Sequence, residues 1–181
     1  MNAGRVFVVD DEPTVLAALG RMLRASGFEV STFASPSDFL AAAPRDGVGC
    51  VLLDLSMPDM SGHDVQDTMR RDGIAMPIIF LSAHGDVPSA TRAMREGAID
   101  FLVKPIAEAE LLGAIRRALE TASAQERRRV SRSEVEARLA RLTPRERQVC
   151  DLVIKGLLNK QIGSELGMSE KTVKVHRGQV M

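Results

Sequence analysis

The sequence predicts an α/β protein in which a five-stranded, doubly wound parallel sheet is followed by a small all-helical domain. Over the first 120 residues, five short apolar runs alternate with segments of helical period. Three of those runs are apolar almost throughout, which is typical of parallel strands that are covered on both faces. The remaining residues contain short helical segments joined through a glycine. A length of 181 residues suits one full domain and a smaller one.

The strands are expected at residues 6–9, 28–33, 50–55, 77–82 and 100–103. The first helical segment carries Val15, Leu19 and Leu23 at helical spacing and closes at Gly27. The other helices of this half are expected to begin near Ser35, Gly62, Asp86 and Glu108. These alternating elements predict a first domain over residues 1–121.

A linker is predicted over residues 122–141, followed by a second domain over residues 142–181. The linker contains no Pro or Gly, so we expect a polar helix, although the charge repulsion within Arg127–Arg129 leaves a flexible linker as an alternative. Thr143-Pro144-Arg145-Glu146 then forms a capping box that starts a helix ending at Gly156.

A second short helix is expected near Asn159, and Gly167 allows a turn before a third helix that Ser169 caps. Val173 and Val180 of this third helix are expected to be core residues. Two short helices joined through a glycine turn suggest a helix-turn-helix.

Charge is divided unequally between the two halves of a chain that is neutral overall. Residues 1–120 hold 11 Lys and Arg against 17 Asp and Glu, and residues 121–181 hold 13 against 7. The acidic half suits a metal ion and the basic half a polyanion, although a charge run is also typical of a solvated face. Because Trp and Tyr are absent and all six Phe lie in the first half, the basic half favours duplex DNA over single strands.

The composition excludes membrane and disordered classes. No apolar run approaches the roughly 18–20 residues of a membrane span, and 45% of the residues are hydrophobic. The N-terminus lacks the pattern of a signal peptide, so a cytoplasmic location without membrane contact is expected. Cys50 and Cys150 are interpreted as small core hydrophobes.

Acidic residues follow two of the predicted strands. Asp10 and Asp11 come after the first strand and Asp54 ends the third; in the strand order 2-1-3-4-5 these two strands flank the ligand crevice. We therefore expect three carboxylates to converge there, and their oxygen atoms favour Mg²⁺. Ser82 and Lys104, which follow the fourth and fifth strands, open onto the same crevice. Taken singly each is an ordinary turn, cap or surface residue, but together they predict a phosphoryl site.

The segments VVDDE, LLDLSMPDMSG, LSAH and LVKP resemble the motifs of a bacterial response-regulator receiver domain, which has a flavodoxin-like fold, over residues 4–121. The resemblance implies that Asp54 accepts a phosphoryl group from a sensor histidine kinase. It also implies that Asp11 and Asp54 are Mg²⁺ ligands, with Asp10 as the accompanying acid and the backbone carbonyl of Ser56 as a further ligand.

The same resemblance implies how the phosphoryl group is bound and sensed. Lys104 would neutralise its oxygens, Ser82 would hydrogen-bond to them, and Phe101 would be the switch aromatic, although plain core packing of Phe101 is equally open. Ser56 and His84 occupy positions that set the rate of phosphoryl loss in this family. Pro105 matches a position where the family has a cis peptide.

The segment from LTPRERQV to TVKVHRGQVM resembles the helix-turn-helix of LuxR-type regulators, and its pairing with a receiver resembles the NarL/FixJ family. The comparison makes residues 170–181 the recognition helix in the major groove. The residues expected to contact DNA are Lys171, Thr172, Lys174, Val175, Arg177, Asn159 and Lys160. A solvated basic helix of a protein-interaction domain is the alternative. Because that family has a fourth helix beyond this point, we expect a trimmed chain whose small domain is frayed and binds DNA poorly.

Together these features predict a transcription factor controlled by phosphorylation of Asp54. A homodimer formed on phosphorylation, or release of a masked helix-turn-helix, would bring it to promoter DNA. Its chemistry would be limited to self-catalysed phosphoryl acceptance and slow autodephosphorylation. The alternatives are a phosphate-sink or protein-interaction receiver without independent DNA binding, and a Mg²⁺-dependent phosphatase, which the lack of a substrate-covering cap disfavours.

Overall fold

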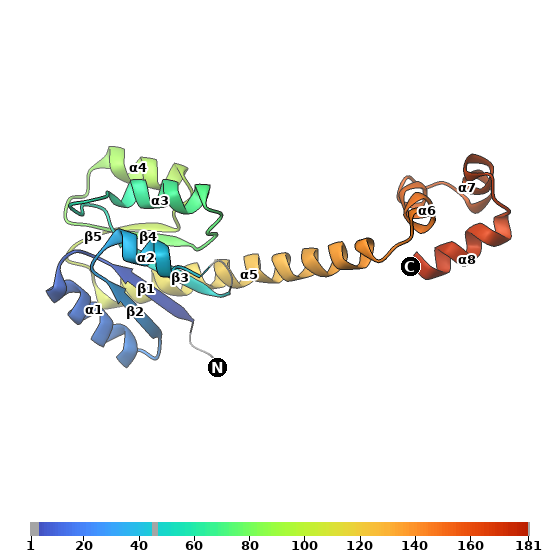
Figure 1. Cartoon of the computed structure of the whole chain (residues 1–181). Helices are drawn as coiled ribbons and strands as arrows, with labels where there is room; N and C mark the ends of the chain where they lie inside the picture. Colours follow the sequence, from blue (N-terminus) through green and yellow to red (C-terminus); the bar gives the residue numbers. More distant parts are fainter. Residues whose placement is uncertain (1–3, 45–46, 181) are drawn as a thin grey trace. The chain divides into compact units, whose positions relative to one another are not determined.

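Five parallel strands form one sheet in the order β2-β1-β3-β4-β5, the order predicted from the sequence (Figure 1). The computed structural model describes residues 4–44 and 47–180. The strands are β1 (Arg5–Val9), β2 (Glu29–Phe33), β3 (Gly49–Asp54), β4 (Ile78–Ser82) and β5 (Asp100–Val103). Every residue of β3 and β4 is buried, which explains why their sequence runs are apolar on both faces.

Helices cover both faces of this sheet. The alternation within β1 sends Val6 and Val8 into a core shared with α1 (Pro13–Ala25) and α5 (Glu108–Ala140). Phe7 and Val9 point to the opposite core, shared with α2 (Pro36–Ala42), α3 (Gly62–Arg71) and α4 (Val87–Arg95). The predicted doubly wound architecture is thus confirmed.

α5 is one helix of 33 residues that continues through the segment predicted to be a linker. The buried side chains of α5 lie between Leu111 and Ala122, and every side chain from Arg127 to the end of the helix is exposed. The chain divides into two compact units, Met1–Arg127 and Arg128–Met181. None of the helices formed within residues 4–44 and 47–180 is both long and apolar enough to cross a membrane.

The second unit contains α6 (Pro144–Ile154), α7 (Asn159–Leu166) and α8 (Glu170–Val180). They pack around a core of four buried residues, which are Val149, Leu152, Ile162 and Val173. The predicted capping box starts α6, and Gly167 takes the left-handed conformation that closes α7, with φ of 65°. The predicted core position of Val180 lies outside the side chains that the structure describes, as does Met181.

The two cysteines, which were both expected to be core residues, differ in burial. Cys50 is fully buried in the core of the first unit, as predicted. Cys150 is only half-buried, because it lies on α6 beside the small four-residue core rather than within it. The prediction of a core role for both thiols is therefore wrong for Cys150.

Candidate functional site

The carboxyl ends of β1, β3 and β5 bring Asp10, Asp54 and Lys104 together. The Nζ of Lys104 donates to Asp10 Oδ2 and to Asp54 Oδ1, each at 2.7 Å. The side chains of Asp10 and Asp54 are only 1% and 8% exposed. Two carboxylates are thus buried around one ammonium group, so this site carries an excess of negative charge.

Backbone amides hold the other carboxylate oxygens in place. The N–H of Ser56 donates to Asp54 Oδ2 at 2.7 Å, and the N–H of Glu12 donates to Asp10 Oδ1 at 2.9 Å. Burial acts to lower the pKa of Lys104, but its hydrogen bonds to Asp10 and Asp54, with their charges, raise that pKa above its ordinary value. Lys104 therefore stays protonated at neutral pH.

The predicted convergence of three carboxylates is not seen in this arrangement. Within residues 4–44 and 47–180, no three His, Cys, Asp or Glu side chains are placed to hold a metal ion. The ammonium of Lys104 lies between Asp10 and Asp54 and supplies a positive charge there, and Asp11, the next residue after Asp10, is half-buried. The oxygen donors and the excess negative charge nevertheless fit Mg²⁺.

Ser82 and Phe101 each contact a nearby residue in the structure, and neither contact involves Asp10, Asp54 or Lys104. Ser82 is 2% exposed; its hydroxyl donates to the carbonyl of His84 at 2.6 Å and accepts the N–H of His84 at 3.1 Å. Phe101 is half-buried, with its ring centroid 6.4 Å from that of Phe80. The Lys104-Pro105 peptide is cis, as the family resemblance implied.

Gly62, which was expected only as the start of a helix, also belongs to the site. A Cβ at this position would lie 2.6 Å from the carbonyl oxygen of Asp54 and 2.9 Å from the ring of Phe80. The first residue of α3 therefore packs directly on the backbone of Asp54. The signal in the sequence is a glycine immediately after a serine cap in DMSG, eight residues after the acidic strand end.

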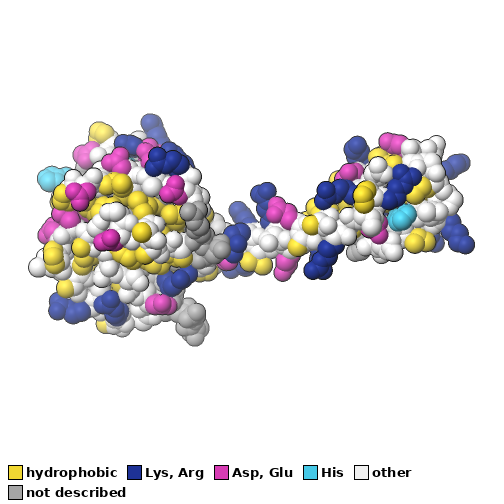
Figure 2. Space-filling view, in the orientation of Figure 1, with side chains coloured by type: hydrophobic (Ala, Val, Ile, Leu, Met, Phe, Trp, Pro, Cys, Tyr) yellow, Lys and Arg dark blue, Asp and Glu magenta, His cyan; other side chains and the backbone are white. Residues whose placement is uncertain are grey.

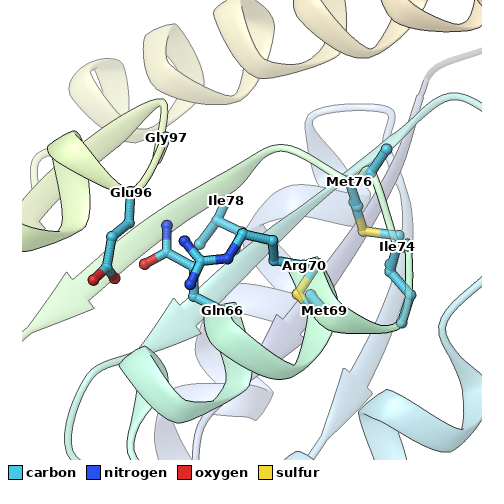
Figure 3. A pocket seen from close by; sticks show the side chains of 10 residues that line it. Gln66, Met69, Arg70, Ile74, Met76, Ile78, Glu96 and Gly97 are labelled. Atoms are coloured by element: carbon cyan, nitrogen blue, oxygen red, sulfur yellow. The ribbon is translucent and has the colours of Figure 1, made fainter.

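A pocket of about 290 Å³ lies apart from the acidic site (Figure 3). Its walls come from the end of α3, the start of β4 and the end of α4, and they include Gln66, Met69, Arg70 and Glu96. Ile78, the first residue of β4, also lines the pocket, which therefore lies near the amino ends of the strands, whereas Asp54 lies at the carboxyl end of β3. The residues that line the pocket do not include Asp10, Asp54 or Lys104.

The residues predicted to contact DNA fall into two groups. The exposed group comprises Lys160, Lys171, Thr172, Lys174 and Val175. Arg177 and Asn159 are half-buried and form a hydrogen bond with each other. Figure 2 shows several Lys and Arg side chains on the visible face of this unit.

Models of two protein families match the chain. Residues 6–116 match the response regulator receiver domain, and residues 140–181 match the bacterial regulatory proteins of the luxR family. The second match argues against a receiver that lacks a DNA-binding domain.

Relatives and solved structures share both parts. The response regulator protein TodT of Pseudomonas putida strain F1 is 46% identical over 180 residues, which cover 99% of this chain and 79% of TodT. The transcriptional regulatory protein FixJ of Rhizobium meliloti strain 1021 is 43% identical over 176 residues, or 97% of this chain and 86% of FixJ. The structure of the response regulator StyR matches with a TM-score of 0.87 and 45% identity, over 98% of this chain and 89% of StyR. The chain therefore belongs to the two-component response regulators that join a receiver domain to a LuxR-family helix-turn-helix and regulate transcription.

Proposed function

We propose that Asp54 is the phosphoacceptor and that its phosphorylation by a sensor histidine kinase controls DNA binding. The observation that supports this proposal is the placement of Lys104 Nζ 2.7 Å from a buried oxygen of Asp54. A carboxylate oxygen of Asp54 attacks the phosphorus of a phosphohistidine, the P–N bond breaks, and its electron pair stays on the imidazole of the donor. Lys104 neutralises the negative charge on the transferred group. The chemistry proposed for the chain is this self-catalysed phosphoryl acceptance, followed by slow hydrolysis of the phosphoaspartate.

The donors around Asp54 are suited to Mg²⁺. Asp11 and Asp54 would hold it together with the backbone carbonyl of Ser56, and Asp10 would be the accompanying acid. When bound, the ion neutralises charge on the phosphoryl oxygens. Asp10 and the Ser56 amide keep Lys104 and Asp54 in position.

The test is incubation of the full chain with acetyl phosphate in the presence and absence of MgCl₂, followed by intact mass spectrometry. The wild type is expected to gain the mass of one phosphoryl group only with Mg²⁺, and Asp54→Asn is expected to gain none. Asp59→Asn is the matched control, because Asp59 is an exposed carboxylate in the loop after β3. Full modification of Asp54→Asn would overturn the assignment of the acceptor.

Phosphorylation would act through Ser82 and Phe101. The Ser82 hydroxyl would exchange the carbonyl of His84 for a phosphoryl oxygen, and Phe101 would move into the vacated space. The resulting change at the face of α4, β5 and α5 would favour a homodimer or release a masked helix-turn-helix in the cytoplasm. Analytical ultracentrifugation with and without acetyl phosphate separates these two outcomes, since only the first changes the mass of the particle.

The basic face of α8 would bind promoter DNA in the major groove. Lys174 and Val175 are exposed near its centre, with Lys171 one turn earlier and Lys160 on α7. Fluorescence anisotropy with a labelled duplex, measured between 50 and 200 mM salt, tests this. A log–log dependence of affinity on salt is expected because each phosphate contact releases counterions. Absence of binding at every salt concentration would contradict the proposal.

A further inference from the structure

Two side chains that were expected to contact DNA, those of Arg177 and Asn159, form a hydrogen bond with each other in the structure. Arg177 of α8 donates through Nη1 to Asn159 Oδ1 at 2.9 Å. Asn159 is the first residue of α7, so this bond joins the start of one helix to the later turns of the other. Both side chains are half-buried, whereas those of Lys171 and Lys174 are exposed.

A second arginine binds the other end of α7. Arg145 of α6 donates through Nη2 to the carbonyl of Leu166, the last residue of α7, and through Nη1 to Gln148 Oε1 at 2.9 Å. Carbonyls in the last turn of a helix lack partners within that helix, and a cation there also complements the helix dipole. α7 is thus held at both ends by guanidinium groups from its two neighbours.

The small size of this unit makes such bonds consequential. Its core has four buried residues, of which α8 contributes Val173 and α7 contributes Ile162, and four half-buried residues, Val153, Leu157, Leu166 and Met168, pack against them. Apolar burial is not directional, so such a core constrains the rotation of α8 on α7 less tightly than a hydrogen bond with defined geometry does. The hydrogen bond between Arg177 and Asn159 lies about one helical turn from Val173 on α8 and from Ile162 on α7, and its defined geometry adds a directional constraint to this apolar contact.

We propose that Arg177 and Asn159 are positioning residues, which fix α8 on α7 and do not themselves bind DNA phosphates. This inference rests on the proposed function of α8 as the helix that enters the major groove. It removes two residues from the expected DNA contacts and leaves the exposed lysines to neutralise phosphates. Arg177 then affects affinity by holding Lys174 and Val175 in register with the groove.

The test compares Arg177→Met, Asn159→Ala and the double variant in the full chain, using a labelled duplex of mixed sequence between 50 and 200 mM salt. Lys174→Met is the matched control, because it removes the same charge from the same helix at an exposed position. A lost phosphate contact lowers the slope of log affinity against log salt by about 0.9, and this is expected for Lys174→Met. Arg177→Met is expected to weaken binding about 5-fold to 10-fold with the slope unchanged.

The double variant is expected to bind as weakly as either single variant, because both changes remove the same bond. Additive losses, or a slope for Arg177→Met that falls as it does for Lys174→Met, would overturn the inference. Urea unfolding of the same variants provides a test without DNA: the effects at positions 159 and 177 are expected to be coupled, and independent effects would overturn it. If the wild type does not bind duplex DNA, the proposed function fails, and the unfolding result still decides whether the bond exists.

Discussion

At the scale of single residues, the site depends on a balance between buried charges. Asp10 and Asp54 are nearly inaccessible to water and share the ammonium of Lys104. Two carboxylates in such a place are stable only while a cation lies between them or one of them is protonated. Lys104 therefore stabilises the resting protein, and in the function proposed above the same ammonium would also neutralise the charge of a phosphoryl group.

Replacing Lys104 tests its contribution to the stability of the folded protein. Lys104→Met is expected to lower the free energy of unfolding by about 1–3 kcal/mol, because the buried carboxylates lose their charged donor. Urea unfolding followed by circular dichroism in EDTA measures the change. The double variant Lys104→Met/Asp54→Asn is expected to recover part of the loss, since one of the two charges is removed. Unchanged stability of Lys104→Met would show that the carboxylates do not depend on Lys104.

The two thiols differ in their predicted reactivity. Burial raises the pKa of Cys50 to about 12, so this thiol is protonated at pH 8 and inaccessible to reagents. Iodoacetamide is expected to modify the half-buried Cys150 in the native protein and Cys50 only after unfolding. Peptide mass spectrometry identifies the labelled cysteine. Early labelling of Cys50 in the native state would indicate that the core around it opens readily.

At the scale of the elements, α3 is positioned by a glycine. Gly62→Ala is expected to destabilise the receiver domain by about 1–3 kcal/mol, since its Cβ would overlap the carbonyl of Asp54 and the ring of Phe80. Gly113→Ala is the matched control, because its Cβ would meet only Arg117, at an ordinary distance of 3.6 Å, in the interior of α5. That variant is expected to gain about 0.5–1 kcal/mol. Equal effects of the two changes in urea unfolding would contradict the close approach at Gly62.

The start of α6 gives the second unit a defined dependence on pH. The backbone N–H of Thr143 donates a hydrogen bond to the carboxylate of Glu146, and so does the Thr143 hydroxyl. The backbone bond first and the hydroxyl bond second lower the pKa of the Glu146 carboxyl below its ordinary value of 4.5. A carboxyl group with a lowered folded pKa contributes stability that is present above the unfolded pKa and is lost as pH falls through the folded pKa. Glu146→Gln is therefore expected to be less stable than the wild type at pH 7, with a difference that shrinks as the pH falls below the ordinary pKa of 4.5 and through the lowered pKa of the folded state. Thermal unfolding followed by circular dichroism measures this, and Glu134→Gln in the exposed part of α5 is the control.

Local sequence predicted the elements well because each one repeats a local rule. The buried strands β3 and β4 are apolar on both faces, and the Thr143 box sets the start of α6 with side chains three residues apart. The convergence of Asp10, Asp54 and Lys104 followed from the strand order. Three features depend on side-chain placement across elements: Lys104 between two carboxylates, the pairing of Arg177 with Asn159, and the contact of Gly62 with Asp54. No spacing in the sequence encodes the first two of these features, whereas the glycine that follows the serine cap in DMSG is a sequence signal for the third.

At the scale of the whole molecule, one helix belongs to both compact units. α5 packs on the sheet through Leu111, Ile115 and Ala118, and it continues beyond Arg127, where the two units divide. From Arg127 to Arg141 every side chain is exposed. In this part the helix is stabilised mainly by its own backbone and by short-range pairs such as Arg132 with Glu136, whose Nε and Oε1 lie 2.8 Å apart. Pairs of this kind contribute little.

The exposed part of α5 is therefore the place where the native chain should open first. An isolated helix of about 15 residues is marginally stable in water, so local opening there costs much less than unfolding either compact unit. Limited trypsin digestion is expected to cut first between Arg127 and Arg141, giving two fragments that keep helical circular dichroism signals. Mass spectrometry of the early products identifies the bond.

Substitution of the arginines in this segment by Gln is expected to slow the first cut, because trypsin then loses its sites in the segment whose local unfolding requires the least free energy. The arginines concerned are Arg127, Arg128, Arg129, Arg132, Arg138 and Arg141. Arg116 and Arg117 on the packed part of α5 serve as internal controls, since cleavage there requires the helix to leave the sheet. A first cut at Arg116 or Arg117, or within α6 to α8, would show that the exposed helix is more stable than the units it joins.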